Sequence, residues 1–415
     1  MSLSSPVFLR GQTARRRFGR FLAIAACLAI GACSTPPVTS EATPAPEPPP
    51  APHQVTAEAP QFTRLPNTQD AAVPVRVGVI LPFENPNANV RGLAKSLMHA
   101  AEMALYDSGN RNIILMTAED NGAPADAAAA AQKLLNEGAE VIVGPLFAAS
   151  VSAVAPVARD HGVPVLAFST DRTVAGNGVY LLSFQPQSEV RRVVTYAAAQ
   201  GRKKIGAFIP ATAYGDVVEA ELRKVAEENH FPLCAVARFS PSAGALTEPA
   251  ATLAKADCDA VLVPQGGSLL RGIAQTFAYS AIDTTKVKLL GTGLWNEPSS
   301  QKEGLLSGAW FAAPQPSTDD AFIVKYRHTF GSEPPQLASL AYDAVSLVAL
   351  LANGTPYHRF TPRAITDPNG FAGVSGVFRF RADGAIERGL AVLAIEPGGF
   401  TVVNPAPATF QQVHS

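Results

Sequence analysis

After residue 74 the chain alternates short runs rich in Val and Ile with longer, Ala-rich segments whose apolar residues recur at helical spacing. The short runs predict strands and the longer segments predict helices, in repeated order. In the first series we expect strands at 75–81, 112–117, 141–143 and 164–167, and helices at 93–106, 123–137 and 151–161. Because these strands are apolar on both faces, they belong in a parallel sheet covered by helices, and right-handed crossovers favour a doubly wound topology.

A helix expected at residues 187–200 opens a second series of the same kind. Its strands are expected at 204–209, 233–239, 260–263 and 287–291, and its helices at 214–229, 246–256 and 269–279. About 330 residues exceed what one hydrophobic core usually holds, so we expect two α/β lobes with a cleft between them. The remaining segments return to these lobes: helices at 318–330 and 337–352, and a strand pair at 376–380 and 390–396 around the turn 382–384.

The first 33 residues have a different pattern, with five arginines and no acidic residue before the apolar run 21–30. A basic start, a short apolar stretch and small residues are typical of a signal peptide. The run has about half the length that a membrane-spanning helix needs. Arg15, Arg16 and Phe18 resemble a twin-arginine motif, so export by that route or by the general secretory route stays open.

The segment Ile30-Gly31-Ala32-Cys33 resembles the bacterial lipobox, whose cysteine is acylated and becomes the first mature residue. The resemblance implies a lipid on Cys33, with an ordinary cleavage site as the alternative. An Asp after the cysteine would be the usual signal for inner-membrane retention, and this chain has Ser34 there. We therefore expect a lipid anchor in the outer membrane, on its periplasmic face.

Residues 34–74 contain eleven prolines mixed with Ala, Thr, Glu and Gln. Such a composition cannot pack a core, so we expect a disordered tether that spans up to roughly 100 Å. The folded part is then expected at 75–405, followed by a tail at 406–415.

The charge of the chain and the motifs that it lacks argue against several classes of function. The formal net charge is −1 and no basic cluster follows the signal peptide, which argues against a nucleic-acid partner. The chain lacks a nucleophile elbow, a phosphate-binding Gly-Lys-Ser/Thr loop and Cys/His spacing suited to zinc, so we expect no enzyme, cofactor or metal. Cys234 and Cys258 start strands that flank a third one, and we expect free buried thiols, with a bridge as the alternative.

Ligands of open parallel sheets meet the carboxyl ends of the strands, where helix N-termini present unpaired N–H groups. The ligand-binding candidates in such loops are Ser150, Ser169, Thr170, Asp171, Tyr214, Asp216 and Trp295. The hydroxyl groups could donate to a ligand carboxylate, and the acidic side chains could bind a ligand ammonium group. The aromatic rings could line the cleft with apolar surface. Capping of helices and turns, or packing under loops, would use the same residue types.

Three stretches carry a family resemblance: VRVGVILPF from Val75, residues 138–171, and KKIGAFIPATAYGDVVEAEL from Lys203. They resemble type I periplasmic binding proteins of the leucine-binding kind. Within that superfamily, Gly144-Pro145-Leu146, residues 338–352 and residues 373–392 resemble outer-membrane lipoproteins that activate penicillin-binding proteins. Well-known activators carry an additional N-terminal helical-repeat domain, in place of which this chain has only the proline-rich tether.

The resemblance implies a two-lobed clamp whose chain crosses between lobes near 182–186, 311–314 and 355–369. The first lobe would hold 75–184 and about 314–356, and the second 185–313 and about 370–405. It also implies a function by protein contact: activation of a bifunctional penicillin-binding protein, and so regulation of peptidoglycan synthesis. The alternatives are a substrate-binding protein of a branched-chain amino acid ABC transporter, with Ser169 and Thr170 holding a small amino acid, and a scaffold that has lost its ligand.

Overall fold

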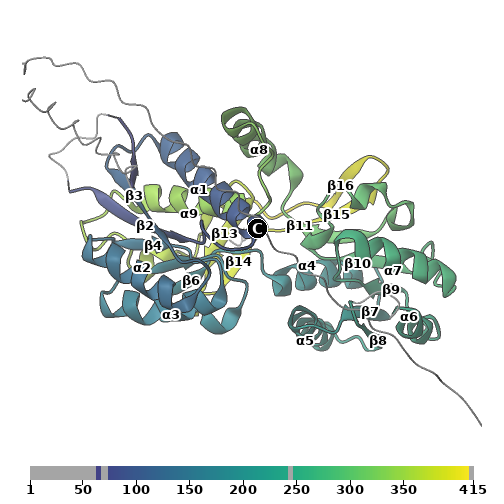
Figure 1. The fold of residues 1–415 in the computed structure, drawn as a ribbon. Coiled ribbons are helices and arrows are strands. Elements are labelled where there is room, and N and C mark those ends of the chain that lie inside the picture. The colour runs from purple at the N-terminus through teal and green to yellow at the C-terminus, as the bar shows by residue number, and fades with distance from the viewer. Residues whose placement is uncertain (1–61, 67–72, 242–245, 411–415) are drawn as a thin grey trace, which may run out of the picture. The chain divides into compact units, whose positions relative to one another are not determined.

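The computed structural model describes residues 62–66, 73–241 and 246–410, and Figure 1 labels their helices and strands. The first sheet has the strand order β1-β3-β2-β4-β5-β6. Its strands are β1 (Phe62–Arg64), β2 (Val75–Leu81), β3 (Ile113–Glu119), β4 (Val141–Val143), β5 (Val165–Ala167) and β6 (Val179–Leu181). All neighbours pair in parallel except β1, which runs antiparallel to β3.

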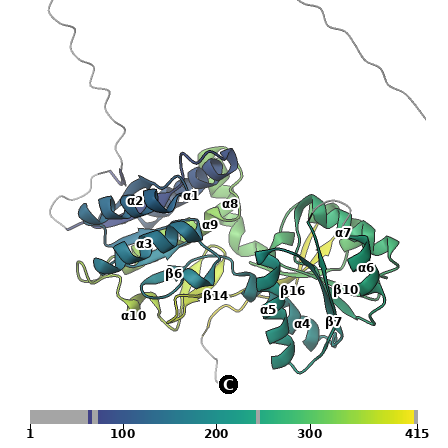
Figure 2. The ribbon, with the colours of Figure 1, turned by 60° about the horizontal axis from the view of Figure 1, so that its bottom comes forward.

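Helices cover both faces of the first sheet (Figure 2). One face packs against α2 (Pro124–Asn136) and α3 (Ala148–Asp160). The other packs against α1 (Ala88–Ser108) and α9 (Ala338–Leu351), and α8 (Pro316–Phe330) joins the same core by packing against these two helices. The short α10 (Pro362–Ile365) adds Ile365 to the same core. This lobe is the doubly wound layer that the alternating pattern predicts.

The second sheet has the order β16-β15-β11-β10-β9-β7-β8. Its strands are β7 (Ile205–Pro210), β8 (Leu233–Phe239), β9 (Ala260–Leu262), β10 (Lys288–Gly291), β11 (Trp310–Ala313), β15 (Ala391–Glu396) and β16 (Gly399–Asn404). On one face lie α4 (Pro186–Ala199) and α5 (Ala213–Glu228), and on the other α6 (Thr247–Ala254) and α7 (Gly267–Tyr279). Short 3-10 turns occur at η1 (Arg172–Val174), η2 (Gly293–Trp295), η3 (Ser300–Lys302) and η4 (Gly304–Leu306). The two-lobed α/β fold is therefore confirmed.

The fold begins earlier than the sequence predicts. Phe62 pairs with Met116 in the β1–β3 ladder, the Thr63 hydroxyl donates to Glu102 Oε1 at 3.0 Å, and Leu65 is buried. The expectation of a tether that continues to Pro74 is thus wrong for residues 62–66. The strand is only three residues long and prolines stand close to it on both sides, so composition concealed it.

The expected pairing of residues 376–380 with 390–396 is also wrong. Instead β12 (Phe371–Gly373), β13 (Gly376–Phe380) and β14 (Ile386–Arg388) form a separate antiparallel sheet. Its side chains Phe378 and Ile386 belong to the core of the first lobe, so residues 371–388 do not belong to the second. The chain crosses to the second lobe between β14 and β15, and not at 355–369, where Arg359 binds the first-lobe residue Glu140.

A buried ion pair lies beside this last crossing. Arg388 Nη1 is 3.3 Å from Asp343 Oδ2, and both side chains are almost fully buried. The Val374 N–H donates to Asp343 Oδ1 at 2.7 Å. The Arg388 guanidinium lies 4.8 Å from the ring centroid of Phe184, which belongs to the first crossing between lobes. The first and last crossings are therefore joined through a single side chain.

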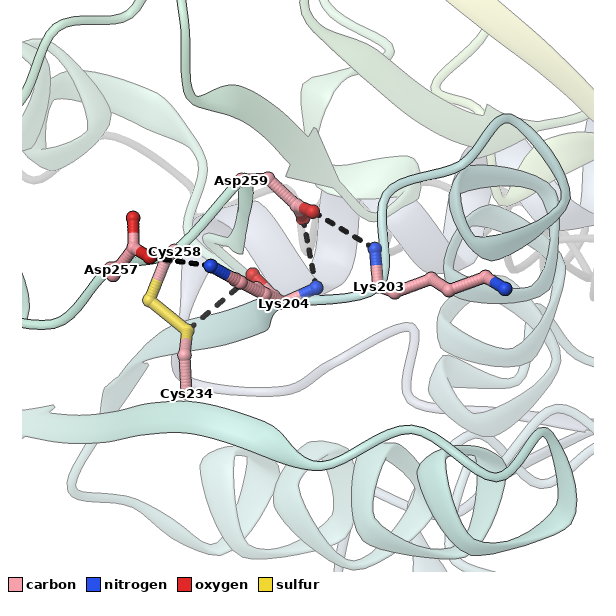
Figure 3. Close-up of a disulfide and its surroundings, with 6 residues drawn as sticks. All are labelled: Lys203, Lys204, Cys234, Asp257, Cys258 and Asp259. Carbon is pink, nitrogen blue, oxygen red and sulfur yellow. Dashed lines mark hydrogen bonds and ion pairs between the residues drawn. A yellow bond between two sulfur atoms is a disulfide. The ribbon is translucent and has the colours of Figure 1, made fainter.

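Cys234 and Cys258 form a disulfide, so the expectation of free thiols is wrong (Figure 3). Their Cα atoms are 5.6 Å apart. The bridge crosses β7 at Gly206, where a Cβ atom would lie 2.8 Å from Cys258 Sγ and 2.9 Å from Cys234 Sγ. The bridge can cross the middle strand because Gly206 has no side chain.

Hydrogen bonds to a carboxylate and an ion pair connect the strand ends beside this bridge. The Asp259 carboxylate accepts hydrogen bonds from the backbone N–H groups of Lys203 and Lys204, at 3.0 and 3.1 Å (Figure 3). Lys204 Nζ is 2.5 Å from Asp257 Oδ2.

In the part of the chain that the structure describes, no helix has the length and apolar character needed to cross a membrane.

Candidate functional site

The N-terminus of α3 lies at the carboxyl ends of the strands of the first sheet. It follows β4 after the turn Gly144–Pro145, where a Cβ atom on Gly144 would lie only 2.2 Å from the Ile80 carbonyl oxygen. The N-cap residue is Phe147, which offers no side-chain acceptor to the first-turn amides. The positive end of the helix dipole is thus left without a capping group.

Ser150 stands in this first turn and not at the N-cap. Its side chain is fully buried, and its Oγ makes no hydrogen bond of ordinary geometry among the described residues. Asp120, at the end of β3, is buried next to it and receives the Gly122 N–H at 3.0 Å on Oδ1. Burial raises the pKa of Asp120, while the Gly122 N–H and the Ser150 hydroxyl act in the opposite direction.

An open cavity of about 550 Å³ lies at the ends of β2 and β3 and along α2. Its polar lining includes Glu84, Glu119, Asn121, Asp126 and Lys133. Burial also raises the pKa of Glu119, although backbone N–H groups donate to its carboxylate. This part of the edge has more acidic than basic groups.

The candidates after β5 are occupied by local turns. Ser169 is buried, and its Oγ accepts the Asp171 N–H at 3.1 Å. Asp171 Oδ1 caps η1 by accepting the Thr173 N–H at 2.9 Å and the Thr173 hydroxyl at 2.7 Å. Thr170 is exposed between them. Ser169 and Asp171 therefore have the turn and capping roles that the sequence left as alternatives.

In the second lobe, Tyr214 is in the first turn of α5, and its hydroxyl lies 3.0 Å from Thr292 Oγ1. Burial raises the pKa of Tyr214, and the nearby Glu189 carboxylate adds to this shift. Glu189 is itself buried in the first turn of α4, where its Oε2 accepts the Gly293 N–H at 3.0 Å. Burial raises the pKa of Glu189 to about 7.

The two remaining candidates are engaged within the second lobe. Asp216 Oδ1 is 2.5 Å from Arg238 Nη2 in an exposed ion pair. Trp295 is fully buried over Gly291, and its indole N–H donates to the Gln265 carbonyl at 2.8 Å. Trp295 therefore packs under its loop and does not line a cleft.

Sequence reasoning missed Asp120 and Glu189, the two buried acids at these edges. Asp120 could have been noticed because it directly follows an apolar strand and precedes Asn121 and Gly122. Glu189 had no such signal, since an acid in the first turn of a helix is stabilised by the dipole whether it is buried or exposed. The lipidation candidate Cys33 lies outside the described residues.

Comparisons with known proteins agree with this architecture. A Rhodospirillum rubrum structure, titled a putative branched-chain amino acid ABC transporter, is 15% identical with a TM-score of 0.71, covering 80% of this chain and all of that one. The Streptococcus pneumoniae substrate binding protein in complex with isoleucine is 19% identical with a TM-score of 0.59, covering 80% of this chain and 100% of its own. A Rhodopseudomonas palustris solute binding protein in complex with 4-hydroxybenzoate is 16% identical with a TM-score of 0.61, covering 81% of this chain and 97% of that one.

Among curated proteins, an uncharacterized protein of Rickettsia prowazekii is 20% identical over 151 residues, which is 36% of this chain. The match spans only 39% of that relative. The family described as periplasmic binding protein matches residues 74–399, which include every helix and strand of both lobes except β1 and all but the first residue of β16. The chain therefore belongs to the periplasmic binding protein family and has its type I fold.

Proposed function

We propose that this protein is an exported solute-binding protein that receives a small carboxylate ligand at the carboxyl end of the first sheet and serves an ABC transporter. The N-terminus of α3 supports this best, because its first turn has no side-chain cap. Free N–H groups and the helix dipole favour an anion at such a terminus. The protein acts by binding and release, without chemistry on the ligand.

Ser150 adds a second donor to this terminus. Its buried hydroxyl interacts with the Asp120 carboxylate without a hydrogen bond of ordinary geometry, and it would turn from Asp120 toward a ligand oxygen. A hydrogen bond from a buried hydroxyl to a charged carboxylate stabilises a complex by roughly 1.5–3 kcal/mol. The backbone groups and Ser150 together match the two oxygens of one carboxylate.

The ligands in the names of similar structures share this group. Isoleucine, benzoate, 4-hydroxybenzoate and 3,4-dihydroxybenzoic acid all carry a carboxyl group, although their other ends differ. Amino acids and aromatic acids are therefore the two ligand classes to compare for this chain.

Calorimetry with the purified mature chain tests the proposal. Isoleucine, leucine, benzoate and 4-hydroxybenzoate are titrated beside their neutral amides. We expect binding of at least one acid and not of its amide, and a loss of about tenfold or more with Ser150→Ala. Equal affinity for acid and amide would refute the carboxylate site.

A charge variant separates the helix terminus from general effects on folding. Ala149 is exposed in the first turn of α3, so Ala149→Asp adds a negative charge at the proposed site while favouring the helix. The uncharged Ala149→Asn is the matched control. We expect the acid ligand to bind more weakly to the Asp variant than to the Asn variant, and unchanged binding in both would contradict the model of recognition.

A second candidate function rests on the N-terminal sequence and on the activator-like motifs. Cys33 followed by Ser34 suits an outer-membrane lipid anchor, and the proline-rich segment that follows suits a partner far from that anchor. In this function the clamp activates a bifunctional penicillin-binding protein by contact. Stimulation of glycosyltransferase and transpeptidase activity by the chain, without binding of any of the four acids, would favour the activator over the receptor.

Anchoring itself is tested by fractionation. Cys33→Ala should release the protein from the membrane fraction into the soluble periplasm without changing its thermal unfolding. Wild-type protein found free and unmodified in the periplasm would rule out the lipid anchor, whichever function holds.

A further inference from the structure

The last described residues of the chain pass from the second lobe back to the first. β16 ends at Asn404 in the second sheet, and residues 405–410 continue without a helix or strand. We call this segment the C-terminal strap, and its sequence is Pro-Ala-Pro-Ala-Thr-Phe. Its two prolines each have a fixed φ angle, which makes the strap stiff.

Arg192 of α4 holds the near end of the strap in the second lobe. Its guanidinium donates to the Asn404 side chain and, at 3.1 Å, to the Pro405 carbonyl oxygen. Through Nε it also donates to the Leu390 carbonyl oxygen at 2.7 Å. Leu390 lies at the last crossing between the lobes, just before β15. One side chain therefore joins the start of the strap to that crossing.

The middle of the strap contacts two of the three crossings. The Ala406 N–H donates to Gln315 Oε1 at 3.2 Å, and Gln315 lies between β11 of the second lobe and α8 of the first. Pro407 packs on Gly389, which lies between β14 and β15. A Cβ atom on Gly389 would be 3.1 Å from Pro407 Cγ and 3.2 Å from its carbonyl oxygen. Because rotation of one lobe against the other has to occur in the crossings, it moves groups that the strap contacts.

Phe410 holds the far end of the strap in the first lobe. Arg379 Cζ, in β13, lies 4.6 Å from the centroid of the Phe410 ring, and a Cβ atom on Gly370 would lie 2.9 Å from Phe410 Cδ2. Arg379 is held by hydrogen bonds to Glu387 Oε2 at 2.7 Å and to the Pro368 carbonyl oxygen at 3.0 Å. A guanidinium fixed in this way offers its flat face to an aromatic ring.

We propose that the C-terminal strap is a latch on the hinge between the lobes. With Phe410 seated on Arg379, the strap restrains rotation of one lobe against the other, and rotation requires the ring to leave its seat. Phe410 is half-buried although residues 407–409 are exposed, so the ring is the apolar anchor of an otherwise exposed end. The latch goes beyond the proposed solute-binding function, because it acts on the lobes whether or not a ligand is bound.

Pulsed electron paramagnetic resonance between spin labels on the two lobes tests the latch. The labels are attached at Asp160→Cys in α3 and Lys224→Cys in α5, two exposed positions. The protein is the full mature chain with Cys33→Ala, whose two other cysteines form the disulfide. We expect Phe410→Ala to raise the ratio of altered to original lobe distance about tenfold, since it removes both the apolar and the cation–π contact.

Two control variants keep the latch. Phe410→Tyr retains the ring, and Val402→Ala removes an exposed apolar side chain from β16. Both should show the wild-type distance distribution. Arg379→Gln should act like Phe410→Ala and should add little to it in the double variant, because the two changes remove the same contact.

The latch is refuted if Phe410→Ala leaves the distance distribution unchanged. A lower melting temperature with an unchanged distribution would show that Phe410 has only a structural role, and would also refute it. Full additivity of Phe410→Ala and Arg379→Gln would show that they do not act through one contact. The measurement is made without ligand, so failure of the carboxylate proposal would be seen separately.

Discussion

Removal of the Cys234–Cys258 bridge should change the cost of a side chain at Gly206. The two cysteines are 24 residues apart, and in the chain-entropy description a loop of that length stabilises the folded state by about 3.5 kcal/mol. We therefore expect the Cys234→Ala, Cys258→Ala double variant to lose about that much free energy of unfolding. This loss alone does not test whether the disulfide passes over β7 at Gly206.

The crossing is tested by Gly206→Ala in both backgrounds. With the bridge intact, the added Cβ would lie 2.8 and 2.9 Å from the two sulfur atoms, and overpacking of this kind costs about 1–3 kcal/mol. Without the sulfurs, the remaining close neighbour is the Ala235 carbonyl oxygen at 3.0 Å. Alanine also restricts the unfolded chain, which favours folding by roughly 0.4–1 kcal/mol. We expect a coupling free energy of about 1–3 kcal/mol between the two changes.

Tryptophan fluorescence during urea unfolding is a suitable assay. The chain has two tryptophans, Trp295 and Trp310, and both belong to the second lobe that contains the bridge. The signal therefore follows the lobe that is perturbed. If Gly206→Ala had the same cost with and without the cysteines, the reasoning about the crossing would be wrong.

Three further perturbations have defined outcomes. Arg388→Met leaves the Asp343 carboxylate buried without its partner and should lower the free energy of unfolding by about 3–5 kcal/mol, and the added change Asp343→Leu should recover part of this in thermal unfolding. Burial raises the pKa of Glu189 to about 7 from its ordinary 4.5, so the native state binds this proton more tightly than the unfolded state. Stability should then fall by about 3 kcal/mol as pH rises from about 4.5 to 7, and Glu189→Gln should remove this fall in a pH series of urea unfolding. A chain that starts at Val75 lacks the buried Leu65 and the β1 pairing, and should melt at lower temperature than one that starts at Gln61 by an amount that corresponds to roughly 1.5–3 kcal/mol. Equal melting temperatures would show that β1 adds nothing.

Periodicity predicted the elements whose patterns are long and local. The strands β2 and β7 and the helices α1 and α5 could be placed from apolar spacing alone, and repetition of strand and helix implied two parallel sheets. The three-residue strands β1 and β14 could not, because such short segments carry no measurable period. Their places depend on pairing with strands remote in sequence.

The candidate site was predicted less completely than the fold. The loops at the carboxyl ends of the strands followed from topology, and Ser150 lies where a helix start was expected. The hydrogen-bond partners of the candidate residues could not be predicted from the sequence, because burial of Asp120 and Glu189 depends on how several loops pack together. From the sequence, the two cysteine strands were expected to flank a third one, but the disulfide was not predicted. A bridge across β7 requires a residue without a side chain at the crossing, and only the register of the strands shows that this residue is Gly206.

The antiparallel direction of β1 also determines how mechanical load would enter the first lobe. Phe62 stands level with Met116 in the ladder, so tension applied from the N-terminal side acts first on that residue pair and then on the next. Once the three pairs have opened, the segment 62–74 has a fully extended length of at most about 45 Å, and it must straighten before β2, in the interior of the sheet, carries any force. The β1 strand would thus open before force reaches β2 and the rest of the first lobe. Single-molecule stretching should show this as a small early extension that a chain starting at Val75 lacks.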